Sequence, residues 1–364
     1  MQKAIPYMQI RGGSSKGLYF NARDLPQTIE EKDRLLVSAM CGRGPSDVRQ
    51  IDGLGGGDPL TSKVGIVSLS LREDADLEYE FVQVVLGEGK TDRTQNCGNI
   101  LAGVVPFALE TGMLPAKGLV TEYRVFMSNS ASICKVRVMT PEGAITYAGN
   151  TSIDGVPGTS APINCLYEGI TGATCGALLP TGNKVDVIED VPVTCLDNGM
   201  PVVLIRAEDV GKSGYESLKE LSDDHQLKEQ LEKIRLIVGP MMNLGDVIDK
   251  VVPKMTLIAP PRNGGIISTR SFIPHRVHAA VGVLAAVTIA TGCLIPGTVA
   301  ETVAKIPNDH SGDLYLVEHP SGGISVSLEF ETGTEIPVMK NAGVVRTARA
   351  LSCGEILIPE EEKL

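Results

Sequence analysis

One thiol in the sequence lies where it could exchange a proton with a bound ligand. Cys97 is part of the turn Asn96-Cys97-Gly98-Asn99, which directly precedes the apolar run 100–109. Asparagine is a favoured N-cap residue, so the pattern predicts a buried helix that begins here with Asn96 as its cap. The first N–H groups of a helix have no intrahelical partner and favour an anion. A cysteine in this position is a candidate acid or base.

Lys63 is the second candidate for proton transfer. It opens the predicted strand 64–71 and shares a strand face with Gly65 and Val67. Because side chains alternate along a strand, Lys63 begins the more apolar of the two faces. A lysine that is neutral in such a setting can act as a general base. The alternative is an ordinary solvated lysine at a strand end.

A glycine-rich turn lies upstream of both candidates. Residues 11–17 combine three glycines, two serines and two cations between the predicted strands 3–10 and 18–21. Such a turn presents backbone N–H groups together with positive charge, which suits a carboxylate. Ser14 and Ser15 could equally be turn formers, and Lys16 could be a surface charge.

The second half of the chain carries a comparable arrangement. The turn 197–201 holds Asn198, and the polar segment 274–278 precedes the apolar run 279–295, which predicts a second helix. Arg270 and His275 are both candidates to bind a substrate carboxylate. Arg270 is the better of the two because a guanidinium binds a carboxylate through two hydrogen bonds. His275 and His278 could cap this helix, contact substrate or bind a metal, but no HExxH or CxxC motif supports a metal.

Length and pattern predict an α+β protein of two domains. A chain of 364 residues exceeds the ~250 to 300 residues beyond which single cores tend to split. We expect an N-terminal domain over 1–187, with Lys63 and Cys97, and a C-terminal domain over 188–364 whose last strand can return to the first. Each half reads as strands after a glycine turn and then an apolar helix. This predicts two pseudo-twofold-related domains, each with a central apolar helix.

Charge and cysteine usage limit the partners. The net charge of −11 argues against nucleic acid or an anionic membrane as the main partner. The run 279–295 is shorter than the ~20 residues of a membrane span. Eight cysteines without CxxC spacing indicate reduced thiols, and residues 1–10 do not resemble a signal peptide, so we expect a cytoplasmic protein. Exposed sheet edges are compatible with a homodimer.

The chain resembles the methylaconitate isomerase and 4-oxalomesaconate tautomerase family over essentially its whole length. The segments that carry this resemblance are 11–17, 51–53, 60–64, 96–99, 153–158 and 318–322. Three further segments resemble the tautomerase branch most: 175–183, 197–203 and 270–275. The resemblance implies a diaminopimelate-epimerase-like fold, in which each of the two pseudo-twofold-related domains is a curved, mostly antiparallel sheet or barrel around a central apolar helix. It also implies an isomerase of small unsaturated polycarboxylates that needs neither metal nor organic cofactor.

By this resemblance the catalytic pair is Lys63 and Cys97. We expect substrate contacts from Ser14, Ser15, Lys16, Ser62, Asn96, Gly98, Asn99, Asn198, Arg270 and His275. The leading hypothesis is a tautomerase that performs a 1,3-proton shift on 4-oxalomesaconate in the breakdown of aromatic acids such as gallate. Methylaconitate cis-trans isomerase and methylitaconate delta-isomerase are alternatives of the same class, and a non-catalytic polycarboxylate-binding protein is one of another class. A two-thiol racemase is disfavoured because the predicted second helix start lacks a cysteine.

Overall fold

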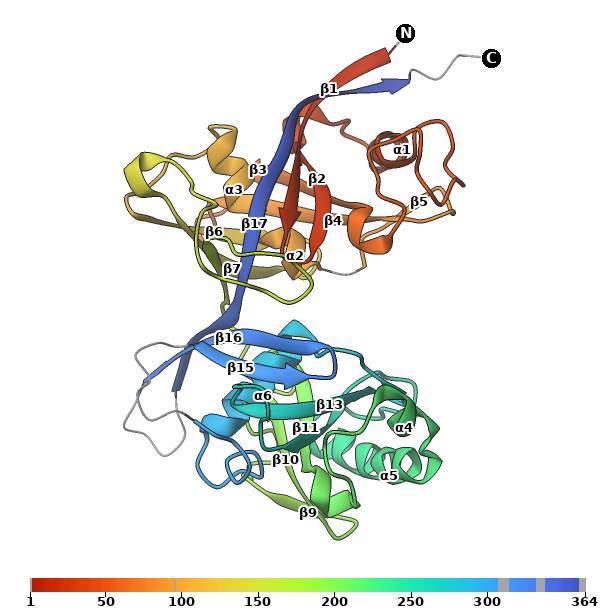
Figure 1. The fold of residues 1–364 in the computed structure, drawn as a ribbon, viewed down its shortest axis with the longest axis vertical. Helices are drawn as coiled ribbons and strands as arrows, with labels where there is room; N and C mark the ends of the chain where they lie inside the picture. Colours follow the sequence, from red (N-terminus) through yellow and green to blue (C-terminus); the bar gives the residue numbers. More distant parts are fainter. Residues whose placement is uncertain (1, 95, 307–313, 332–337, 360–364) are drawn as a thin grey trace. The chain divides into compact units, whose positions relative to one another are not determined.

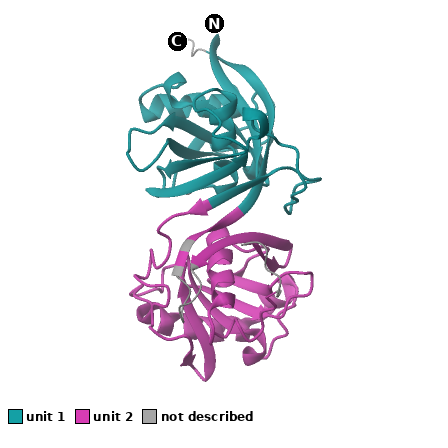
Figure 2. Ribbon diagram, turned by 90° about the vertical axis from the view of Figure 1, so that its left-hand side faces the viewer, with its two compact units in different colours: residues 1–165, 345–364 teal, residues 166–344 magenta. Residues whose placement is uncertain are grey.

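The computed structural model describes residues 2–94, 96–306, 314–331 and 338–359. The chain divides into two compact units, drawn in teal and magenta in Figure 2. The first unit comprises residues 1–165 and 345–364, and the second comprises residues 166–344. The division therefore falls at residue 165, whereas the sequence predicts residue 187.

The first unit is mostly β-structure with three α-helices among its described residues (Figure 1). Its helices are α1 (Ile29–Cys41), α2 (Gly98–Leu101) and α3 (Val104–Glu110), with 3-10 turns at Ala22–Asp24, Pro59–Thr61 and Pro141–Gly143. Its strands are β1 (Gln2–Gly12), β2 (Ser15–Asn21), β3 (Lys63–Leu69), β4 (Leu77–Val85), β5 (Lys90–Asp92), β6 (Val120–Met127), β7 (Ser132–Met139) and most of β8 (Pro162–Tyr167).

Side chains along β2 and β3 point alternately to the two faces of the sheet, and the first unit has a core on each face. On one face, Phe20, Val64 and Ile66 pack with α1 through residues such as Leu36. On the other face, a Cβ at Gly65 would meet Tyr19 at 3.0 Å and Ile100 at 3.2 Å. Glycine at this position therefore lets α2 lie directly on β3. Lys63 belongs to this second face because it lies two residues before Gly65.

The apolar run after Cys97 does not form one helix, because the chain breaks between α2 and α3. A Cβ at Gly103 would lie 2.3 Å from the hydroxyl of Tyr19. That hydroxyl donates to the carbonyl of Ile100 at 2.6 Å, and burial raises the pKa of Tyr19 well above its usual value. The break also accommodates Pro106. It falls in the first turn of α3, where a missing N–H removes no intrahelical bond.

The second unit contains the remaining elements. Its helices are α4 (Leu218–Asp223), α5 (His225–Met241) and α6 (Val283–Leu294), with a 3-10 turn at Ala207–Val210. Its strands are β9 (Asp186–Ile188), β10 (Val191–Asp197), β11 (Pro201–Arg206), β12 (Lys254–Ala259), β13 (Ile267–Ile273), β14 (Arg276–Val277), β15 (Leu314–His319) and β16 (Gly322–Glu331).

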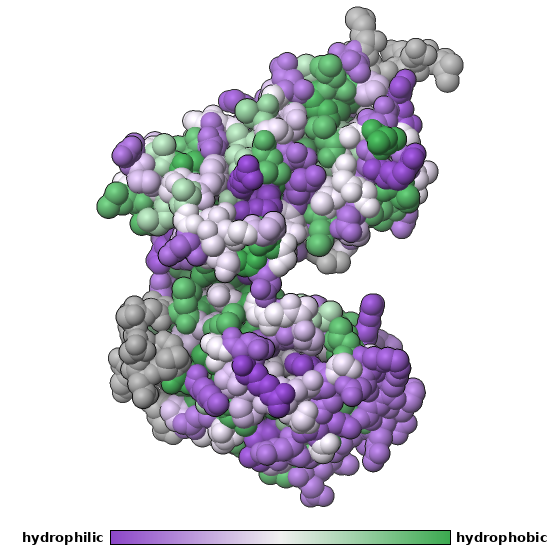
Figure 3. All heavy atoms as spheres, viewed as in Figure 1, coloured by the Kyte–Doolittle hydropathy of each residue, from purple (hydrophilic) through white to green (hydrophobic). Residues whose placement is uncertain are grey.

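Two helices cover opposite faces of the second sheet. Val203 and Leu257 face a core that includes Leu231 and Val238 of α5. On the other face, a Cβ at Gly292 of α6 would approach Leu196 and Leu204 at 2.7 Å. Figure 3 shows hydrophilic residues gathered over the outer surface of α4 and α5. In the described part of the chain, no helix is long and apolar enough to span a membrane.

The predicted start of the second apolar helix is wrong. Helix α6 begins at Val283, with Gly282 as its N-cap. The segment 274–278 instead lies around the turn between β13 and β14. The apolar residues before Gly282 form a loop that is held by polar contacts: His278 Nδ1 accepts from Ala280 N at 2.9 Å, and Ser321 Oγ donates to Ala279 O at 2.7 Å.

The last strand, β17 (Val338–Pro359), contributes to both units. Its first residues pair antiparallel with β16, and its later residues pair antiparallel with β1 from Gly12 to Gln2. Strand β1 pairs with β2 only from Met8 to Gly12. The amino-terminal half of β1 thus pairs with β17 and not with β2.

Candidate active site

Strands β3 and β4 place a row of side chains beneath α2. Their antiparallel register pairs Lys63 with Gln83, Gly65 with Phe81, and Val67 with Tyr79. Directly opposed residues share a face, so Tyr79, Phe81 and Gln83 lie on the same face as Lys63. This is the face on which α2 packs.

The side chain of Lys63 is half-buried and has two neighbours in this row. Its Nζ donates to Gln83 Oε1 at 3.0 Å. The same nitrogen lies 5.0 Å from the centre of the Phe81 ring. No acidic side chain is paired with Lys63 among the described residues. The amine is therefore held by a neutral acceptor and an aromatic face.

Cys97 itself is the N-cap of α2, with φ −128° and ψ 101°. The predicted cap, Asn96, is wrong: the amide of Asn96 donates to the hydroxyl of Ser130 instead. The hydroxyl of Tyr79 donates to the carbonyl oxygen of Cys97 at 3.2 Å. Since Tyr79 is two residues from Phe81 on the same face of β4, the structure brings the Cys97 turn and Lys63 to one face of the sheet.

The glycine-rich turn between β1 and β2 packs against the same helix start. A Cβ at Gly12 would lie 2.3 Å from Asn99 O, and a Cβ at Gly13 would lie 2.1 Å from Asn99 Oδ1. Gly13 also has a φ of 51°, which favours glycine. Asn99 Nδ2 donates to Ser14 Oγ at 3.1 Å and to Ser15 Oγ at 3.4 Å. Ser14, Ser15 and Asn99 thus form one polar cluster next to Cys97.

Two other predicted contacts of the first unit lie elsewhere. Lys16 follows Ser15 on β2, so its side chain lies on the opposite face, that of Leu18 and Phe20. In the backbone register of β1 and β2, Lys16 is opposite Arg11. Ser62 is fully buried, and its hydroxyl donates to Gln50 Oε1 at 2.8 Å. The structure therefore does not bring the side chains of Lys16 and Ser62 to the Lys63 row.

In the second unit, Asn198 is committed to the protein interior. It is fully buried, its Oδ1 accepts from Thr171 Oγ1 at 2.9 Å, and its Nδ2 donates to Thr291 Oγ1 at 2.9 Å. Its backbone N–H donates to Thr288 Oγ1 at 3.1 Å. These bonds tie the turn after β10 to α6, which is a structural role.

Arg270 and His275 lie apart from α6. Arg270 pairs with Leu257, so its side chain is on the α5 face of the sheet. Its guanidinium donates to the carbonyls of Glu216 and Thr269, both at 2.9 Å, and burial lowers its pKa. His275 is exposed in the turn after β13, with Nδ1 3.8 Å from Glu232. Among the described residues, no group of three potential ligands could hold a metal ion.

The sequence did not point to three residues of the Lys63 row: Tyr79, Phe81 and Gln83. All three lie in β4, where period-two alternation gives no reason to single out particular side chains. The signal that could have found them is register: once β3 and β4 are paired as a hairpin, Gln83 is opposite Lys63.

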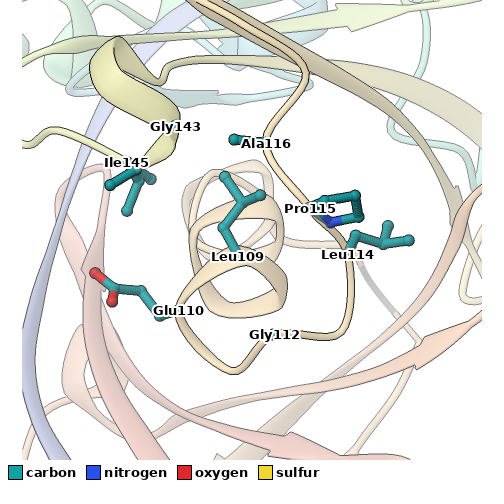
Figure 4. A pocket seen from close by; sticks show the side chains of 9 residues that line it. Leu109, Glu110, Gly112, Leu114, Pro115, Ala116, Gly143 and Ile145 are labelled. Atoms are coloured by element: carbon teal, nitrogen blue, oxygen red, sulfur yellow. The ribbon is translucent and has the colours of Figure 1, made fainter.

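A hollow of about 610 Å³ lies elsewhere in the first unit, beside the end of α3 (Figure 4). It is lined by Leu109, Glu110, Gly112, Leu114, Pro115, Ala116, Gly143, Ala144 and Ile145. Its only ionisable side chain, Glu110, accepts from Tyr147 at 3.0 Å. A hollow whose lining has a carboxylate and no basic side chain does not suit a polyanion, so the Lys63 and Cys97 region remains the better candidate.

The cysteines differ in accessibility, which predicts selective alkylation. Cys97 is partly exposed and Cys353 is exposed, whereas the other six are buried. Burial, with nearby Asp197 and Asp186 respectively, raises the pKa of Cys175 and of Cys195 to about 12. We expect iodoacetamide near neutral pH to label Cys97 and Cys353, as read by peptide mass spectrometry. A polycarboxylate substrate should protect Cys97 alone, and equal protection at Cys353 would contradict this site.

The comparisons with known proteins now give the class of the protein. The family model described as PrpF protein matches residues 2–359. The chain therefore belongs to the PrpF family. Among solved structures, a methylitaconate-delta-isomerase has a TM-score of 0.87 and 29% identity, covering 98% of this chain and 96% of that chain. The predicted fold class is thereby confirmed.

Individual relatives of known name are similar to the chain over almost its whole length. The chain is 52% identical to the 4-oxalomesaconate tautomerase of Pseudomonas putida, over 98% of this chain and 97% of that protein. It is 50% identical to the (4E)-oxalomesaconate Delta-isomerase of a Novosphingobium species, covering 98% of each. The 3-methylitaconate isomerase of Eubacterium barkeri is 32% identical, over 100% of this chain and 99% of that protein.

Proposed function

We propose that this protein is an isomerase that performs a 1,3-proton shift on 4-oxalomesaconate. One observation carries the chemistry: Lys63, which has no acidic partner among the described residues, and Cys97, at the start of α2, lie on one face of the β3–β4 hairpin. The names of the two most similar relatives above support the substrate. The extent of these matches, 98% of the chain in each, supports transfer of the whole activity.

In the proposed mechanism, the amine of Lys63 acts as the base and removes a proton from the carbon next to a carbonyl or a carboxylate-bearing double bond. The C–H bond breaks, and its electron pair delocalises toward the far end of the three-atom system. The Cys97 thiol delivers a proton there, which leaves a thiolate and an ammonium. Return of one proton from Lys63 to Cys97, directly or through water, restores both groups. General acid and base catalysis of this kind typically contributes about 10²- to 10⁴-fold each.

The polar cluster of Ser14, Ser15 and Asn99 is proposed to bind a substrate carboxylate. Hydroxyl and amide groups, together with the first N–H groups of α2, offer several donors within one turn of Cys97. These donors could also stabilise the negative charge that develops on the substrate. Contacts from Asn96, Arg270 and His275 remain predictions from the sequence.

A single assay tests the function. Purified protein is incubated with 4-oxalomesaconate, methylaconitate and methylitaconate in separate D₂O reactions, followed by NMR and ultraviolet absorbance. We expect fast conversion of 4-oxalomesaconate, with one solvent deuteron incorporated at the reacting position. Faster turnover of methylitaconate would assign the chain to the activity named for the Eubacterium barkeri relative. Binding without any isotope exchange would favour the non-catalytic alternative.

A further inference from the structure

Gln83 is held at both ends of its amide. Three carbonyl oxygens lie within hydrogen-bond distance of its Nε2 and share its two N–H bonds: Ser62 at 2.9 Å, Pro59 at 3.2 Å and Val84 at 3.2 Å. Its Oε1 accepts from Lys63 Nζ at 3.0 Å. The two ends of an amide differ in hydrogen bonding, since the NH₂ only donates and the oxygen only accepts. The carbonyl groups therefore require that the oxygen face Lys63.

This orientation matters for a neutral amine. A neutral lysine has two N–H bonds and one lone pair. An amide oxygen can accept an N–H bond but cannot donate to the lone pair. If the amide were reversed, its NH₂ would instead donate to the lone pair and occupy the basic site. The carbonyls of Pro59, Ser62 and Val84 prevent that reversal because they have nothing to donate.

We propose that Gln83 is the positioning residue of Lys63, which turns the lone pair of Nζ away from the sheet and toward the substrate. The inference rests on the proposed function, in which Lys63 is the base. Gln83 acts through Lys63 and does not itself touch the substrate. A neutral acceptor suits this task, because a carboxylate at the same position would hold Lys63 in its charged form.

The test compares Gln83→Glu and Gln83→Leu with Gln226→Glu, a matched control on the exposed surface of α5. The readout is the pH profile of kcat/KM for the tautomerisation. We expect Gln83→Glu to move the acidic limb upward by about one pH unit or more, with activity regained at higher pH. Gln83→Leu should lower kcat about tenfold or more with a smaller change in KM. Gln226→Glu should leave the profile unchanged.

Each outcome separates the two proposals. Gln83→Leu removes the amide donor of the Pro59 carbonyl, whereas the Ser62 carbonyl keeps the backbone N–H of Val84 at 3.0 Å. Because this loss could disturb the segment 59–62, thermal unfolding is measured for every variant. For Gln83→Glu the readout is the pH at which the acidic limb lies. A constant folded fraction scales all rates of one variant equally, so it does not move this limb. If folded Gln83→Glu has an unshifted profile and Lys63→Ala is inactive, the positioning role of Gln83 is overturned and the role of Lys63 as the base is kept. An active Lys63→Ala overturns the proposed function itself.

Discussion

Replacement of Lys63 by alanine is expected to lower kcat by about 10²- to 10⁴-fold, the usual contribution of a general base. Lys63→Arg should be equally inactive, although it keeps a positive charge, because a guanidinium does not lose its proton in proteins. The arginine variant thus separates a base from a carboxylate contact. Rates are measured by ultraviolet absorbance on 4-oxalomesaconate, with thermal unfolding as the check on folding.

The control for these variants is Lys233→Met, which changes an exposed lysine of α5 in the second unit. It should retain the rate of the original protein. If Lys63→Arg were as active as the original protein, Lys63 would be a binding residue and another group would have to abstract the proton.

Replacement of Cys97 by alanine is expected to stop isomerisation to a similar extent but to spare the first half of the reaction. Lys63 can still remove the substrate proton, and exchange of its ammonium with D₂O returns deuterium to the same carbon. Cys97→Ala should therefore exchange the substrate C–H without forming product, whereas Lys63→Ala should do neither. NMR of recovered substrate measures this difference.

The matched control is Cys353→Ala, at the exposed cysteine of β17, which should isomerise normally. Loss of both exchange and isomerisation in folded Cys97→Ala would reverse the two roles and make Cys97 the base. Full activity of Cys97→Ala would place the second proton transfer on another group or on water.

The local sequence pattern predicted where Cys97 and Lys63 lie in the fold better than it predicted which residues they and their neighbours contact. The turn at Cys97 was identifiable because a polar tetrapeptide meets an apolar run, and alternation placed Lys63 on the face that α2 covers. The cap was not predictable from the same pattern. Asparagine is among the favoured N-cap residues, yet the amide of Asn96 donates to Ser130, which lies in a turn between other strands. Only tertiary structure supplies that competing partner.

Apolar content also misplaced one helix start. Residues 279–282 continue the hydrophobic run before α6, but their backbone groups bond His278 and Ser321. Ser321 lies in the turn between β15 and β16, so the sequence near 279 gives no sign of it. The apolar face predicted for the Lys63 strand also ends early: Val67 is fully buried, whereas Leu69, two residues further along the same face, is 51% exposed.

The pairing of β1 with β17 makes the second unit an insertion within the first. During synthesis, residues 1–165 leave the ribosome long before their last strand exists, whereas residues 166–344 are complete earlier. The inserted unit can therefore fold while the nascent outer unit still exposes an open strand edge. Premature termination would leave the Lys63-bearing unit without its closing strand. Only chains synthesised as far as residue 359 can complete it.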